Sequence, residues 1–237
     1  MNRFITLALV ALVAVAGSAD AQIRRQQATQ GPPAYYVSVG VGAFSANNVS
    51  DGDSQTTWDF GNATSLQYRA SLEKAFSNGI AVGLAGTYVK APLRITEFGV
   101  PQDAGPTTGS CTASCDAEAN VYSLHVNFEA GGGMGFHQVY GASAGMTRYA
   151  NFKRKSDGAT LPPGDAVNAL SGTFSYGFGY RLSARTVIVG LYDIGLVYHS
   201  RDGLGSDQRN TLVPRTLRVS LRQGFGTPAR GGVRRRR

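Results

Sequence analysis

The sequence predicts an all-β fold, an eight-stranded antiparallel up-and-down barrel, from three observations. About eight segments alternate large apolar side chains with small, polar or charged ones, and a period of two is that of a β-strand. The connections between these segments are alternately short and long, as expected when hairpins follow one another. Glycine is also abundant, with 31 residues in 237 against a usual share of roughly 7%, and it shows no collagen repeat.

The start of the chain predicts export from the cytoplasm. Residues 1–21 have the form of a secretory signal peptide, with Arg3, the apolar run FITLALVALVAVA and the small residues ADA at 19–21 before Gln22. The apolar run is too short for a membrane anchor. The expected organisation is a signal peptide 1–21, an N-terminal periplasmic segment 22–33, a barrel 34–226 and a basic tail 227–237.

The first four expected strands span 35–44, 65–76, 80–89 and 120–130, and each presents one apolar and one polar or small face. The apolar face comprises Tyr35, Val37, Val39, Val41, Leu66, Tyr68, Leu72, Ile80, Val82, Leu84, Tyr88, Tyr122, Leu124, Val126 and Phe128. The opposite face comprises Ser38, Gly40, Gly42, Gln67, Arg69, Ser71, Glu73, Ala81, Gly83, Ala85, Thr87, Ser123, His125, Asn127 and Glu129. We expect the apolar face to point outward and the other to line the lumen.

The last four expected strands span 136–149, 172–183, 186–199 and 215–225. The first of these fits either phase, and the phase of 186–199 follows from placing Asp193 inward. The outward residues are expected to be Phe174, Tyr176, Phe178, Tyr180, Leu182, Tyr192, Ile194, Leu196, Tyr198, Leu217, Val219 and Leu221. The inward residues are expected to include Thr173, Ser175, Gly177, Gly179, Arg181, Asp193, Arg218, Ser220 and Arg222.

The pattern of connections favours a transmembrane barrel over a soluble one. Short connections fall at 77–79, 131–135 and 183–185, and long polar ones near 45–64, 91–118, 150–168 and 200–211. Outer-membrane barrels have short periplasmic turns, long external loops and an even number of strands. A soluble barrel of the lipocalin kind has an apolar cavity and a polar outside, the inverse of this pattern.

From Gln22 to Phe225 the chain resembles the small eight-stranded outer-membrane barrels of Gram-negative bacteria, a superfamily that includes OmpA-like and OmpX-like domains. The resemblance implies location in the bacterial outer membrane, contact with its lipids and insertion by the barrel-assembly machinery. Members typically end on a strand with a terminal aromatic residue, and Phe225 resembles that assembly signal. The chain departs from the pattern in having Gln223 where an apolar residue is usual and in continuing beyond Phe225.

Charged residues on the inward faces predict a plugged lumen. We expect Glu73, Glu129, Arg181 and Arg222 near the short turns, and Arg69, His125, Asp193 and Arg218 deeper inside. An eight-stranded barrel is only wide enough for side chains to fill its interior. Charges confined there need partners, because an unpaired buried charge loses its hydration without compensation. The sequence therefore predicts a network of salt bridges and waters.

Cys111 and Cys115 are the only cysteines, and they lie in the longest expected loop. In an exported protein such a pair is most simply a disulfide that closes a small ring. Zinc binding is the alternative, but it needs further ligands, and only Asp116 and Glu118 are near in sequence.

The net charge of +8 is concentrated at the ends of the chain, with Arg24 and Arg25 at one and Arg230 and Arg234–Arg237 at the other. The body between them is close to neutral, which gives no indication of nucleic-acid binding. With both termini on the periplasmic side, the tail is expected either to contact anionic lipid or cell-wall polymers, or to be a solvated end.

The histidines give no catalytic, metal or cofactor site. His125 shares the lumen face with Ser123 and Asn127, and His199, beside Ser200 and Asp202, is expected at the outer rim as a loop residue. The leading hypothesis is a monomeric, non-enzymatic barrel with a structural or interaction role through its external loops. A lipid A-modifying enzyme and a narrow conduit for small molecules are the alternatives.

Overall fold

The structure, a computed structural model, describes residues 33–61, 63–76, 79–98, 111, 114–133 and 135–226. The eight long strands are β1 (Tyr35–Ser45), β4 (Ser65–Ala75), β5 (Ile80–Glu97), β6 (Cys115–Gly131), β7 (Phe136–Arg154), β8 (Val167–Arg181), β9 (Thr186–Tyr198) and β11 (Arg215–Phe225). Three short strands are β2 (Asn48–Asp51), β3 (Thr56–Asp59) and β10 (Thr211–Leu212). The expected signal peptide 1–21 and basic tail 227–237 lie outside the described residues, as does the segment 22–32.

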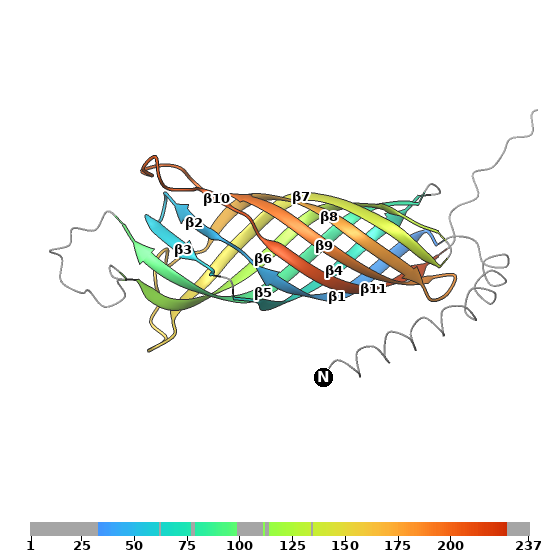
Figure 1. Cartoon of the computed structure of the whole chain (residues 1–237), viewed down its shortest axis with the longest axis horizontal. Helices are drawn as coiled ribbons and strands as arrows, with labels where there is room; N and C mark the ends of the chain where they lie inside the picture. Colours follow the sequence, from blue (N-terminus) through green and yellow to red (C-terminus); the bar gives the residue numbers. More distant parts are fainter. Residues whose placement is uncertain are drawn as a thin grey trace, which may run out of the picture.

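The long strands form a closed antiparallel barrel, which confirms the predicted fold class (Figure 1). Each strand pairs with the next long strand along the chain, and β1 pairs with β11 from Tyr35 opposite Phe225 to Ser45 opposite Arg215. Closure leaves no unpaired sheet edge among these strands. The described residues contain no helix that is long and apolar enough to cross a membrane.

The two ends of the barrel differ. At one end, called the turn end, short connections at 76–79, 132–135 and 182–185 join neighbouring strands. At the other, called the loop end, β2 and β3 form a hairpin that pairs with β5, and β10 pairs with β9 (Figure 1). Short turns at one end and long connections at the other match the predicted arrangement.

Side chains alternate across the barrel wall as the sequence predicts. On the outside, Val39 is 58% exposed and Leu124 is 62% exposed, whereas the inward Glu73 is only 2% exposed. The structure also fixes the phase of β7, which the sequence leaves open, because Tyr140 is exposed and Val139 is buried.

Four strands extend further toward the loop end than the sequence predicts. β5 continues to Glu97, β6 begins at Cys115, β7 continues to Arg154 and β8 begins at Val167. The contrast between the two faces fades in these extensions because inward residues there are apolar, among them Ala91, Leu93, Ile95, Ala117 and Ala119.

A β-bulge near the loop end of β7 reverses which face its side chains take. Asn151 has a φ of 56°, and the register between β6 and β7 shifts between Glu118 and Asn120. Arg148 points outward before the bulge, Phe152 is fully buried after it, and Lys153 is exposed. Bulges of this kind insert an extra residue and redirect the following side chains.

Candidate functional site

The lumen near the turn end contains a cluster of ionised side chains centred on Arg222. Its two guanidinium nitrogens Nη1 and Nη2 form ion pairs with Glu129 and Glu73, from β6 and β4. Asn127 donates a hydrogen bond of 3.0 Å to Glu73, and the Arg222 guanidinium lies 4.2 Å from the ring centroid of Tyr36. All three charged groups are therefore held by partners from other strands.

Two further arginines extend this cluster toward the middle of the barrel. Arg218 donates to Asp193 across 2.7 Å, and Arg69 donates to the Asn127 side chain at 2.9 Å. We call the cluster and the Arg218–Asp193 pair together the lumen network; its members are Arg69, Glu73, Asn127, Glu129, Asp193, Arg218 and Arg222. Three arginines balance three carboxylates, which offsets part of the cost of removing these charges from water.

His125 lies in the lumen among hydroxyl groups. Its Nε2 is 2.7 Å from the Ser171 hydroxyl, and its Nδ1 is 3.3 Å from the Ser143 hydroxyl. A catalytic dyad needs a third group, usually a carboxylate, to orient the base, and both ring nitrogens here contact serine instead. The side chain is buried, so this arrangement supplies polar contacts and offers no open face for a substrate.

Arg181 lines the cavity at the turn end, near the short turns as expected, but its partners are backbone carbonyls and not the lumen carboxylates. Its Nε donates to the Gly133 carbonyl at 2.9 Å and its Nη1 to the Ala184 carbonyl at 3.1 Å. It is the last residue of β8, so the neighbouring turns are its nearest acceptors. Phe225 ends β11 with its ring half exposed on the outside; its role as an assembly signal stays a prediction.

The lumen at the loop end is apolar, in contrast to the polar lumen that the sequence predicts. Trp58 from β3 is fully buried and packs against Tyr149 and Phe152 of β7, with ring centroids 5.2 and 4.9 Å away. We call the whole cluster the loop-end core; it comprises Phe44, Ala46, Val49, Trp58, Phe60, Val89, Ala91, Leu93, Ile95, Cys111, Ala117, Ala119, Val121, Tyr149, Phe152, Leu161, Ala169, Val197 and Leu212.

The hairpin that brings Trp58 into the barrel is also held by a buried acid and histidine. The Nδ1 of His199 lies 3.5 Å from Oδ1 of Asp51, and neither side chain is more than 1% exposed. Ser54 donates to Oδ2 of Asp51 through its backbone nitrogen at 3.0 Å and its hydroxyl at 2.6 Å. Burial raises the pKa of Asp51, but the contacts with His199 and Ser54 outweigh it and leave the pKa below its usual value.

The structure therefore corrects the expectation that His199 is an ordinary loop residue at the outer rim. It follows β9 directly, and its ring packs 5.0 Å from the Trp58 ring and 5.2 Å from the Tyr149 ring. The backbone of the next segment holds the hairpin too, since Gly52 donates to the Ser200 carbonyl at 3.1 Å. A Cβ at Gly52 would lie 2.1 Å from the Asp202 carbonyl oxygen, so only glycine fits this close approach.

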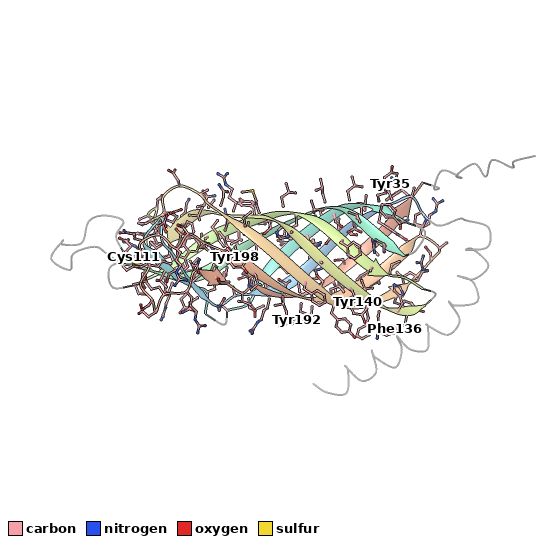
Figure 2. All side chains as sticks on the ribbon, turned by 90° about the horizontal axis from the view of Figure 1, so that it is seen from above. Tyr35, Cys111, Phe136, Tyr140, Tyr192 and Tyr198 are labelled. Atoms are coloured by element: carbon pink, nitrogen blue, oxygen red, sulfur yellow. A yellow bond between two sulfur atoms is a disulfide. The ribbon has the colours of Figure 1, made fainter. Side chains whose placement is uncertain are left out.

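Cys111 and Cys115 form a disulfide, as the sequence predicts. Cys111 is buried in the loop-end core, and its backbone nitrogen donates to Glu97 at 2.7 Å. Figure 2 shows Cys111 at the loop end and Tyr35 near the opposite end of the barrel. No cluster of three or more histidine, cysteine or acidic residues that could hold a metal ion occurs within the described ranges.

Two of the cavities inside the barrel are lined by charged residues of the lumen network. One of about 630 Å³ opens at the turn end and is lined by Arg181, Arg222 and valines including Val187. The other, in the middle of the barrel, is only about 60 Å³ and is lined by groups including Arg69 and His125. The second has room for only a few water molecules.

Comparisons with known proteins add similarities of fold. No protein-family model matches the chain, and no curated protein sequence matches it significantly. One similar structure is Neisserial surface protein A, with 12% identity, a TM-score of 0.49 and coverage of 83% of this chain and 100% of that one. Others are the outer membrane protease OmpT from Escherichia coli (10% identity, TM-score 0.43, 82% and 98% coverage) and the outer membrane protein OprG from Pseudomonas aeruginosa (12% identity, TM-score 0.39, 82% and 95% coverage).

Proposed function

We propose that this chain is an integral, non-enzymatic barrel of the bacterial outer membrane that acts through its loop end. The observation that supports this proposal is a distribution of polar and apolar side chains opposite to that of a soluble protein. Large apolar side chains are exposed on every long strand, and buried charges occupy the lumen. A soluble protein rarely exposes an apolar patch of more than a few hundred Å², whereas a lipid bilayer solvates such a belt.

The outer face contains the aromatic side chains expected where a barrel meets the membrane boundary. Tyr68, Tyr88 and Tyr122 occupy adjacent strands in register, and Phe136 stacks on Phe178 near the turn end. In Figure 2, Tyr140 and Tyr192 lie on the outside of the barrel wall. Aromatic residues of this kind form girdles at the two boundaries of transmembrane barrels.

Insertion is tested by refolding the full chain into lipid vesicles. Folded barrels resist unfolding by detergent and migrate differently on gels before and after heating, so we expect heat-modifiable migration and circular dichroism dominated by β-structure. Substantial helix, or a folded protein that stays in the aqueous phase, would overturn the proposal.

We further propose that the lumen does not conduct. A permeating ion would have to separate the balanced pairs of the lumen network and then cross the loop-end core, where Trp58, Tyr149 and Phe152 pack together. Planar-bilayer recording with pure protein tests this. We expect no reproducible channel steps, and stable steps would replace this proposal with a narrow conduit.

The enzymatic alternative has little support from the geometry. His125 and His199 are both buried, so neither presents a base to an acyl chain from outside. Mass spectrometry of lipid A from cells with and without the protein tests this. A gained or lost acyl chain would show enzymatic activity.

For the basic tail 227–237 we propose contact with anionic lipid or cell-wall polymers on the periplasmic side. The support is its charge, since each arginine near an anionic surface contributes on the order of 1 kcal/mol. Sedimentation of the full chain and a 1–226 variant with peptidoglycan tests it. Equal binding by both would rule out the cell-wall contact.

A further inference from the structure

The outer faces of β5, β6 and β7, with the residue that follows β7, contain a concentrated group of charged side chains at the loop end. We call this group the basic outer face. Its members are the cations Lys90, Arg94, Arg148, Lys153 and Lys155, and the acids Asp116 and Glu118. Both acids belong to β6, between cations of β5 on one side and of β7 on the other.

The two acids are already paired with β5. Lys90 Nζ lies 2.6 Å from Glu118, and Arg94 Nε lies 3.0 Å from Asp116. Within the described part of the chain, neither the β7 cations Arg148 and Lys153 nor Lys155, which directly follows β7, forms an ion pair, and all three are exposed. The face therefore has an excess of cations that points away from the barrel.

The bulge at Asn151 determines that Lys153, near the end of β7, points outward. Without the extra residue, the alternation set by Arg148 would turn Lys153 into the lumen and place Phe152 outside. With it, Phe152 completes the loop-end core and Lys153 extends the outer face. The bulge thus places an aromatic ring in the apolar interior and a cation on the basic outer face.

The register places the basic outer face directly beyond the apolar belt. Tyr122 of β6 pairs with Tyr88 of β5 on one side and with Arg148 of β7 on the other. Aromatic rings mark the boundary of a bilayer, so cations that follow them lie at the depth of the lipid headgroups. At the corresponding end of β1 and β4, the outward residues are the uncharged Ala43 and Leu66.

From these observations we propose that the basic outer face binds the headgroup of an outer-leaflet glycolipid that carries two phosphate groups. The inference rests on the proposed outer-membrane location. Strands β5 and β7 are two strand spacings apart, about 10 Å, so cations on both sides of the acidic β6 row can reach two separate phosphates. Arginine and lysine are the usual protein partners of phosphate oxygens.

We expect the lipid to bind on this side of the barrel and not around its whole circumference. Among the described residues, the side chains of Arg148, Lys153 and Lys155 have no ion-pair partner, and the hydroxylated rings of Tyr88 and Tyr122 lie beside them at the boundary. A soluble anion could bind to the cations but would leave the adjoining apolar surface uncovered. A lipid contacts both surfaces, because its headgroup binds the cations while its acyl chains cover the outward apolar residues below, such as Leu124.

The test uses the full chain folded in nanodiscs of phosphatidylcholine that contain equal minor amounts of phosphatidylglycerol and bisphosphorylated lipid A. Bound lipids are identified and counted by native mass spectrometry. The test variant is Arg148→Gln/Lys153→Gln/Lys155→Gln. The matched control is Arg201→Gln/Arg209→Gln/Arg215→Gln, which removes three exposed charges from the other side of the same end.

We expect lipid A to be retained over phosphatidylglycerol by the natural chain and by the control variant, and its retention to fall about tenfold or more in the test variant. Equal retention by both variants, or no preference between the two lipids, would overturn the inference. Displacement of lipid A by millimolar inorganic phosphate would also overturn it, because the site would then recognise a free anion. Failure of the natural chain to insert at all would instead contradict the proposed function.

Discussion

Near the turn end the barrel interior contains arginines and carboxylates on facing strands, whereas at the loop end it contains Trp58, Tyr149 and Phe152. The two regions fill a similar space with different chemistry. The lumen network needs every partner present, since each buried charge is costly without its counter-charge. The loop-end core depends on packed apolar area, and the hairpin adds Val49 and Trp58 to the side chains that the barrel strands contribute.

The comparison also shows how the two regions are secured. Partners in the lumen network come from β4, β6, β9 and β11, which the barrel itself holds in register. Trp58 instead reaches the loop-end core on β3, held by pairing with β5 and by the contact between Asp51 and His199. We therefore expect damage to the lumen network to affect the whole barrel and damage to the hairpin to affect the loop end first.

The largest expected effect follows from removing the cation at the centre of the lumen network. Arg222→Met leaves Glu73 and Glu129 buried without their common partner, so the free energy of unfolding should fall by about 3–5 kcal/mol. Urea unfolding in lipid vesicles measures this. The control Glu73→Gln/Glu129→Gln/Arg222→Met removes all three charges and should recover much of the loss. Equal losses in both variants would show that charge balance is not what stabilises this region.

The next effect concerns the loop-end core. Trp58→Ala removes the fully buried side chain that joins the hairpin to β7 and should cost about 3 kcal/mol. Hydrogen exchange should show faster opening of β2 and β3, with the turn ends of β4 and β11 unchanged. Trp58→Phe keeps part of the packing and serves as the milder control. Uniformly faster exchange along every strand would contradict the separation of the two regions.

The contrast also explains what could be predicted from the sequence. Where the lumen is polar, as along β4 with Arg69 and Glu73, the alternation between apolar and polar side chains predicts both the strand and which side chains face inward. In the extension of β5, inward Leu93 and Ile95 remove that contrast, so the pattern predicts a strand that ends too early. The bulge at Asn151 hides the direction of Phe152 for a different reason, because its extra residue shifts the alternation by one position.

The candidate site shows a second limit. The charges of the lumen network could be proposed from single strands, because each side chain's face follows from local alternation. Asp51 and His199 could not be paired in this way, since both lie outside the eight long strands and meet only after the hairpin folds back. No short-range pattern reports such a contact, which depends on the path of a long connection.

A smaller effect is expected from His125 in the middle of the lumen. His125→Gln retains a polar side chain but loses the arrangement in which both ring nitrogens contact serines, and should cost about 1 kcal/mol. His125→Leu, which strands the hydroxyls of Ser171 and Ser143, should cost more. Thermal unfolding of the two variants in the same detergent measures the difference. Equal stability of both variants and the natural chain would show that these hydrogen bonds contribute nothing net.

The smallest expected effect is a pH dependence confined to the hairpin. The pKa of folded Asp51 lies below its ordinary value of 3.8, because the contacts with His199 and Ser54 outweigh the effect of burial. The unfolded hairpin therefore binds a proton more readily than the folded one. The stabilisation from this carboxylate is fully present above the ordinary pKa and is lost as the pH falls through the lower, folded pKa.

Fluorescence of Trp58, the single tryptophan of the sequence, reports the opening of the hairpin between pH 6 and pH 2. Asp51→Asn should be less stable at pH 6 and should lose most of this dependence. An unchanged pH profile in Asp51→Asn would show that another group controls the loop end.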